Sequence, residues 1–149
     1  MLVLTAALVL PGVSGAAYAQ LSVQEVIEAR HNGFQETGAA FKSINDQLRS
    51  STPIKFVIQR AARTIVTSAH AIADWFPAGS GPGPGLDTKA RAGIWTDAAA
   101  FQAAQANLIR EADLMAAAAA GDDFARMRAQ ARAMGGACSA CHRQFREAD

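Results

Sequence analysis

Apolar residues return every three or four positions along four stretches of the chain. The stretches cover residues 23–48, 54–75, 94–119 and 124–145, and along each one the apolar positions follow alternating steps of four and three. This spacing puts apolar side chains on one face of an α-helix and is typical of helices that pack along a single stripe. The pattern predicts four amphipathic helices of roughly six turns each.

Residues near the ends of these stretches support the helices. Ser22 and Glu25 have the spacing of a capping box, and Pro53 is expected in the first turn of the second helix, where a proline costs no hydrogen bond. Asp122 and Asp123 are expected in the first turn of the fourth helix, where they complement the helix dipole. Since no proline interrupts a stretch, the sequence predicts an all-α fold, an antiparallel four-helix bundle.

One connection between the predicted helices is much longer than the others. The segment from Pro77 to Gly93 holds five glycines and three prolines and predicts a long loop between the second and third helices. The other two connections, near residues 50–53 and 120–121, are short. Long loops in compact domains often carry function.

The beginning of the chain has the pattern of a targeting segment. An uncharged apolar run from Leu2 to Leu10 is followed by small residues that end in Ala17-Tyr18-Ala19, an A-x-A cleavage site, although no basic residue precedes the run. The run is shorter than the roughly 20 residues of a membrane span. We therefore expect residues 1–19 to be a cleaved signal peptide, in preference to a core helix, and residues 20–149 to form one domain in the periplasm without membrane insertion.

Composition narrows the possible functions. The 149 residues are 50% hydrophobic and 7% aromatic, and 14 Lys+Arg against 13 Asp+Glu give a formal charge of +1. The apolar content excludes intrinsic disorder. The near-zero charge argues against a nucleic-acid-binding or membrane-surface protein.

The strongest chemical signal is the segment Cys138-Ser139-Ala140-Cys141-His142, which contains both cysteines of the chain. C-x-x-C-H is the attachment motif of a c-type haem. One helical turn separates the two thiols, which matches the two haem vinyl groups, and the following imidazole is the axial iron ligand. A disulfide, a thioredoxin-like redox pair and a metal site completed by His31 or His70 are the alternatives, but the redox pair is expected in a βαβ context.

Several further segments make the chain resemble the cytochrome c′ family, including its low-spin cytochrome c-556 relatives. They are Arg30, Trp75-Phe76-Pro77, Gly79-Ser80-Gly81, Ile94-Trp95, Phe101 and the C-x-x-C-H motif with Arg146 four residues beyond His142. The resemblance covers nearly all of residues 20–149. It implies one covalently attached haem c, nitric oxide scavenging or transport, single-electron transfer and a homodimer formed through the first two helices.

Arg30 occupies a position on the apolar stripe of the first helix. A buried guanidinium without a partner is costly, so we expect an anion beside it. A haem propionate is the expected anion, and the resemblance implies the same. The alternatives are an arginine that extends to the surface or one that pairs with a carboxylate of a neighbouring helix.

Phe34, one turn after Arg30, decides the type of haem site. The resemblance implies that low-spin relatives carry a methionine here as the sixth iron ligand, whereas typical cytochromes c′ carry a non-coordinating apolar residue. Phenylalanine offers no lone pair, so the resemblance implies five-coordinate, high-spin iron. Phe34 could also be simply a core aromatic residue.

Two other charged or titratable residues are candidates for the haem environment. His31 lies one position off the stripe and is expected at the haem edge or in solvent, with a role as sixth ligand as the alternative. Arg146, one turn past His142, is expected either near the proximal imidazole or on the surface. The methionines expected in the core or away from the distal side are Met115, Met127 and Met134.

These observations predict a periplasmic single-haem cytochrome that binds nitric oxide and carbon monoxide and transfers single electrons to an unidentified redox partner. The alternative is a low-spin electron carrier of the c-556 type. A peroxidase-like enzyme is disfavoured because Phe34 provides no acid or base. The exposed flank of the first helix is small and polar and allows a second copy to approach. Its members are Gly33, Glu36, Gly38, Ala39 and Ala40.

Overall fold

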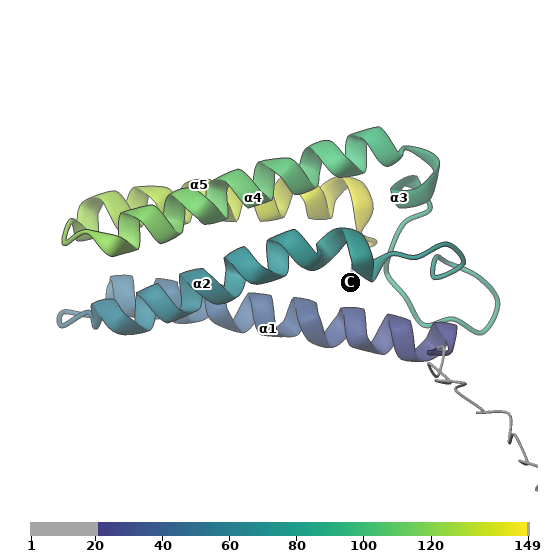
Figure 1. Ribbon diagram of the computed structural model, residues 1–149, viewed down its shortest axis with the longest axis horizontal. Coiled ribbons are helices and arrows are strands. Elements are labelled where there is room, and N and C mark those ends of the chain that lie inside the picture. The colour runs from purple at the N-terminus through teal and green to yellow at the C-terminus, as the bar shows by residue number, and fades with distance from the viewer. Residues whose placement is uncertain (1–20, 149) are drawn as a thin grey trace, which may run out of the picture.

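The computed structural model describes residues 21–148; the predicted signal peptide lies outside the described residues. Four long helices form the described part: α1 (Val23–Arg49), α2 (Lys55–Ala71), α4 (Ala98–Ala120) and α5 (Phe124–Phe145). They run antiparallel, with α1 beside α2 and α4 beside α5 (Figure 1). The prediction of a four-helix bundle is confirmed.

Two short helices differ from the sequence prediction, and both lie next to the long loop. The second helix was predicted to continue to Trp75, but α2 tightens into a 3-10 turn, η1 (Ile72–Trp75), because the conformation of Phe76 is restricted by the proline that follows it. The predicted third helix is split into α3 (Gly93–Thr96) and α4. Asp97 leaves the helical conformation, and its side chain accepts a hydrogen bond from the Ala100 N–H (3.1 Å), which caps α4.

The helix starts agree with the sequence only in part. The Ser22–Glu25 capping box is present, with the Glu25 carboxylate 2.7 Å from the Ser22 N–H. Pro53, expected in the first turn of α2, instead precedes the N-cap residue Ile54. Asp123, expected in the first turn of α5, is its N-cap residue and accepts a hydrogen bond from the Arg126 N–H (3.0 Å).

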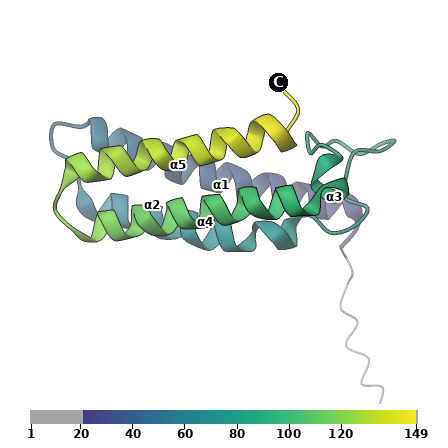
Figure 2. The ribbon, with the colours of Figure 1, turned by 90° about the horizontal axis from the view of Figure 1, so that it is seen from above.

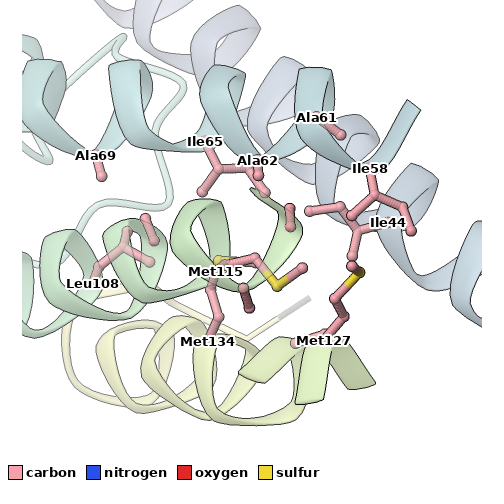
Figure 3. Packing of buried hydrophobic residues seen from close by; sticks show 14 of the residues in the cluster. Ile44, Ile58, Ala61, Ala62, Ile65, Ala69, Leu108, Met115, Met127 and Met134 are labelled. Atoms are coloured by element: carbon pink, nitrogen blue, oxygen red, sulfur yellow. The ribbon is translucent and has the colours of Figure 1, made fainter. Parts of the chain in front are cut away.

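The predicted stripes meet in one core. Large side chains from all four long helices interlock there with at most 1% of their surface exposed (Figure 3). They are Ile44, Ile58, Ile65, Met115, Met127 and Met134. The methionines are thus core residues, and burying a side chain of this size contributes about 1.5–3 kcal/mol to stability.

The loop of residues 76–92 is an ordered part of the bundle end. The Arg91 N–H donates to the Phe145 carbonyl (2.9 Å), and the Glu147 N–H donates to the Lys89 carbonyl (2.8 Å). Figure 2 shows α3 and the loop at the end of the bundle where α5 ends. The loop is therefore fastened directly beside the C-x-x-C-H motif.

Candidate functional site

The register between α1 and α5 places Phe34 and His142 at the same level of the bundle. The Arg128 Nε–H donates to the Leu48 carbonyl (2.8 Å), and a Cβ on Gly135 would lie 3.0 Å from Cζ of Phe41. These two contacts are seven residues, or two turns, apart on each of the antiparallel helices. A further two turns along both helices lead to Phe34 on α1 and His142 on α5.

The C-x-x-C-H motif occupies the last two turns of α5. Cys138 and Cys141 are half-buried against the core and are not joined by a disulfide. Burial raises the pKa of both thiols, and for Cys141 the neighbouring Cys138 adds to the increase. The pKa of His142 is lowered, first by partial shielding from water and then by the positive charge of Arg146. Among residues 21–148, no group of three or more His, Cys, Asp or Glu side chains is placed to hold a metal ion.

The apolar stripes are partly open at Phe34, Cys138 and Cys141. Phe34, Cys138 and Cys141 are half-buried, whereas stripe residues further along the same helices, such as Ile44 and Met134, are fully buried. The α1–α5 pair also has less extensive contact than the α1–α2, α2–α4 and α4–α5 pairs. Two free thiols one turn apart, an adjacent imidazole and a partly open apolar stripe fit a covalently attached haem.

Aromatic side chains surround Phe34. Its ring meets Trp75 edge-on, with 4.9 Å between ring centroids and an interplanar angle of 88°, and lies 6.1 Å from Phe76. Trp75 in turn covers Gly33 of α1, since a Cβ on Gly33 would lie only 2.7 Å from Cη2 of Trp75. The expectation that Gly33 belongs to the exposed flank of the first helix is therefore wrong.

Arg30 is buried, with 4% of its surface exposed, and it holds the long loop. One terminal nitrogen donates to the Trp75 carbonyl (3.3 Å) and to Oγ of Ser80 (3.1 Å). The other donates to the Ser80 carbonyl (3.0 Å) and to Oγ1 of Thr88 (2.8 Å). The guanidinium also lies 4.5 Å from the ring centroid of Phe76.

Burial lowers the pKa of Arg30, and the hydrogen-bond partners found for it among the described residues are all neutral. An arginine that extends to the surface is thus contradicted, and no described carboxylate takes the place of the expected anion. The sequence analysis assigned no role to Thr88, and it singled out Ser80 only as part of the Gly79-Ser80-Gly81 segment, without a contact to Arg30. Hydroxyl residues within a glycine- and proline-rich loop were the available signal, but their distance in sequence from Arg30 hid the contact.

The two histidines outside the motif are on the surface. His31 is exposed, with its Nε2 3.1 Å from Nε2 of Gln35 on the same helix, and His70 is exposed in the last turn of α2. Bringing His31 onto the stripe would require α1 to turn by about 100°. Arg146 is exposed and caps α5, and its N–H donates to the His142 carbonyl (3.0 Å). The structure thus groups Cys138, Cys141, His142 and Arg146, and leaves His31 outside this group.

No helix within the described range is both long and apolar enough to cross a membrane.

A family model described as cytochrome c′ matches residues 25–146. A cytochrome c′ from Rubrivivax gelatinosus is 41% identical over 69 residues, 44% of this chain and 54% of that protein. A cytochrome c′ from Pararhodospirillum photometricum is 28% identical over 85% of this chain and 99% of that protein. A cytochrome c-556 from Agrobacterium tumefaciens is 29% identical over 80% of this chain and 95% of that protein.

Solved structures agree with these relatives. The crystal structure of cytochrome c′ from Rubrivivax gelatinosus matches with a TM-score of 0.75 and 28% identity, over 84% of this chain and 97% of that chain. A nitric oxide complex of a mutant cytochrome c prime from Alcaligenes xylosoxidans matches with a TM-score of 0.76 and 23% identity, over 85% and 98% of the two chains. The second likeness, at this identity, concerns the fold alone.

Proposed function

Because this chain belongs to the cytochrome c′ family, which binds a covalently attached haem c, we propose that it is an exported single-haem cytochrome with five-coordinate, high-spin iron. Cys138 and Cys141 would hold the haem through thioether bonds, and His142 would be the axial ligand of the iron. Bound in this way, the haem supplies a one-electron couple and a coordination position for a diatomic gas.

The position of Phe34 carries this proposal. It lies at the level of His142 on the opposite helix, and its side chain has no lone pair. The methionines at residues 115, 127 and 134 are buried in the core, and His31 is on the exposed side of α1. A sixth protein ligand would therefore need a large rearrangement of the described residues. With a haem bound through His142, the phenyl ring would cover the opposite side of the iron, which would favour small neutral ligands such as nitric oxide and carbon monoxide.

Arg30 supplies a buried positive charge at the same end of the bundle. Its terminal nitrogens donate to neutral oxygens of the loop and of Trp75, so the hydrogen bonds found for it supply no negative charge. A buried cation without a counter-ion is costly, and a haem propionate would provide the missing negative charge. Arg146, whose charge acts on His142, is proposed to tune the proximal imidazole.

Nitric oxide is proposed as a ligand because Phe34 cannot coordinate iron and would leave a position for a small diatomic molecule, and it is the ligand in the solved complex of a protein with the same fold. The protein would bind the gas or pass single electrons rather than catalyse a reaction, since Phe34 provides no acid or base for peroxide chemistry. A second candidate function is that of a low-spin electron carrier, because one relative is a cytochrome c-556. That function requires a sixth ligand from the protein.

Export and dimerisation complete the proposal. The predicted signal peptide at residues 1–19 would direct the protein to the periplasm. On the α1–α2 side, Phe56 and Ile54 expose 61% and 56% of their surface. Association of two copies there would bury these apolar groups. Sedimentation of wild type and Phe56→Glu tests this, with dissociation expected only for the variant.

The absorption spectrum tests the coordination state. We expect high-spin ferric and ferrous spectra for wild type, and carbon monoxide binding to the ferrous form. Phe34→Met should supply a thioether and shift the iron toward low spin, while Phe34→Leu, which also changes size but adds no lone pair, should stay high-spin. A low-spin wild-type spectrum that becomes high-spin in His31→Ala would contradict the proposal and establish the electron-carrier alternative.

A further inference from the structure

Trp75 lies against a notch in α1 that only glycine provides. Three atoms of its six-membered ring, Cη2, Cζ2 and Cζ3, would lie 2.7, 2.8 and 3.1 Å from a Cβ on Gly33. Distances below 3.0 Å are essentially never observed for a real Cβ, so the indole occupies space that any other residue at position 33 would fill. Oγ1 of Thr37 also donates to the Gly33 carbonyl (2.8 Å), which further ties the backbone at this point.

The backbone of Trp75 is held as firmly as its ring. Trp75 is the last residue of η1, and its carbonyl accepts a hydrogen bond from buried Arg30 (3.3 Å). Phe76, the next residue, lies under the guanidinium of the same arginine. Two residues of α1, Arg30 and Gly33, therefore fix the position of the indole from two directions.

The Trp75 ring in turn contacts the ring of Phe34. The two rings meet edge-to-face at 4.9 Å and 88°, a favourable arrangement of two aromatic side chains. A phenyl ring that shields the distal side has to move before a ligand can reach the iron. The indole that Phe34 meets is itself held, by the close approach of its ring to Gly33 and by the hydrogen bond from Arg30 to the Trp75 carbonyl, and therefore restricts how far Phe34 can move toward it.

We infer that Trp75, seated in the notch at Gly33, positions Phe34 and thereby limits the rate at which a diatomic ligand reaches the distal side of the haem. This inference rests on the proposed function. Trp75 acts through Phe34 and is a positioning residue. Phe34 would control access to the iron, Trp75 packs against Phe34, and Gly33 leaves room for the Trp75 ring. Trp75 in η1 thus acts together with two consecutive residues of α1.

The test measures carbon monoxide association with the ferrous holoprotein by flash photolysis. Gly33→Ala adds a methyl group where the indole lies, so the ring has to move away from α1 and its contact with Phe34 is lost. We expect association to accelerate several-fold, up to about tenfold, the rate equivalent of losing one such aromatic contact. Gly38→Ala is the matched control on the same helix, since a Cβ there meets nothing within 4 Å, and its rate should stay within about twofold of wild type.

Trp75→Phe tests the contact between Gly33 and Trp75 by changing the tryptophan instead of the glycine. A phenyl ring lacks the distal ring atoms that fill the notch, so this variant should also accelerate association. In the double variant Gly33→Ala/Trp75→Phe the added methyl group no longer meets an indole. The double variant should therefore bind at the rate of Trp75→Phe alone, a non-additivity that indicates direct coupling between the two positions.

A second measurement does not depend on ligand kinetics. The chain has two tryptophans, so the diamagnetic ferrous carbon monoxide complex should give two indole N–H signals in a ¹H–¹⁵N NMR spectrum, one of which disappears in Trp75→Phe. Gly33→Ala should shift that signal, and Gly38→Ala should leave it in place. This readout reports the displacement of Trp75 itself.

The outcomes separate the inference from the proposed function. If wild type binds no carbon monoxide, both fail. If wild type binds the gas but Gly33→Ala matches Gly38→Ala in rate and in indole signal, only the inference fails. Additive effects of Gly33→Ala and Trp75→Phe would also overturn it, because two residues that act through one contact cannot contribute independently.

Discussion

Arg30 should stabilise the protein mainly by holding the long loop against α1. We predict that Arg30→Met, which keeps most of the volume of the side chain and removes its donors, destabilises the folded protein. The loss should be concentrated in the loop, because the partners Ser80 and Thr88 both belong to it. Trp75, the third partner, ends the segment that leads into the loop.

The size of the effect follows from what each partner loses. The Ser80 carbonyl belongs to a residue with 1% exposure, so water does not replace its donor, and an unsatisfied buried acceptor costs about 1–3 kcal/mol. Thr88 keeps a hydrogen bond from the Ala90 N–H (3.1 Å), and the Trp75 contact is long at 3.3 Å, so both lose less. Loss of the cation–π contact with Phe76 adds about 0.5–2 kcal/mol. Release of a guanidinium from a buried site partly offsets these losses, whereas loss of the proposed propionate contact adds to them, and we expect a net decrease of at least about 2–3 kcal/mol in the free energy of unfolding.

Guanidinium chloride unfolding of the holoprotein measures this free energy, with an unchanged m-value expected. Hydrogen exchange locates the change. The amide of Ser80, which donates to the Pro77 carbonyl (3.2 Å), should exchange faster in Arg30→Met, whereas the amide of Ile44 in the core should follow global unfolding. Arg63→Met, a substitution of an exposed arginine on α2, is the control and should change stability by no more than about 0.5 kcal/mol.

The reasoning would be refuted if Arg30→Met and Arg63→Met had equal free energies of unfolding. It would also be refuted if Arg30→Met lowered stability without faster exchange at Ser80. In that case Arg30 would act on the bundle as a whole, and the hydrogen bonds to the loop would not account for its burial.

Three further predictions concern α5, the haem and the start of the mature chain. Gly136→Ala should stabilise α5 by up to about 1 kcal/mol, because a Cβ there meets nothing within 4 Å. Gly135→Ala should stabilise the protein less, because its methyl group would lie 3.0 Å from Phe41. Thermal unfolding of the two variants measures the difference. His142→Ala should keep the haem attached after extraction with acidified organic solvent, since both thioether bonds remain, but its spectrum should show loss of the axial ligand. Mass spectrometry of protein from a host that matures c-type cytochromes should find Gln20 as the first residue, together with the mass of one haem.

The periodicity of the sequence was sufficient for the bundle but not for the arrangement at its loop end. A packed helix needs apolar side chains along one stripe, and this requirement alone put Arg30, Phe34 and the cysteines on inward-facing positions. The break at Asp97 was missed because the alanines that follow it suit a continuous helix, and only the capping ability of aspartate indicated a new start. The loop contacts of Arg30 depend on a chain path that no local pattern encodes.

Gly33 illustrates a second limit of the sequence. A glycine in the middle of a helix is unfavourable by about 1 kcal/mol relative to alanine, and this cost is itself a signal that something approaches closely. Which residue approaches could not be derived, because Trp75 is 42 residues away in sequence and lies in the short η1 turn that the periodicity did not predict.

The long loop contacts both α1 and α5, the two helices that carry the residues of the candidate site. It is fastened to α1 through Arg30 and to the end of α5 through Arg91 and Glu147. The direct contact between α1 and α5 is less extensive than that of the other neighbouring helix pairs. Under the proposed function the haem would lie between Phe34 and His142, and close packing of α1 on α5 at this end would leave no room for it. The loop contacts both helices and therefore links α1 and α5 at this end of the bundle, where Arg30 holds Ser80 and Thr88.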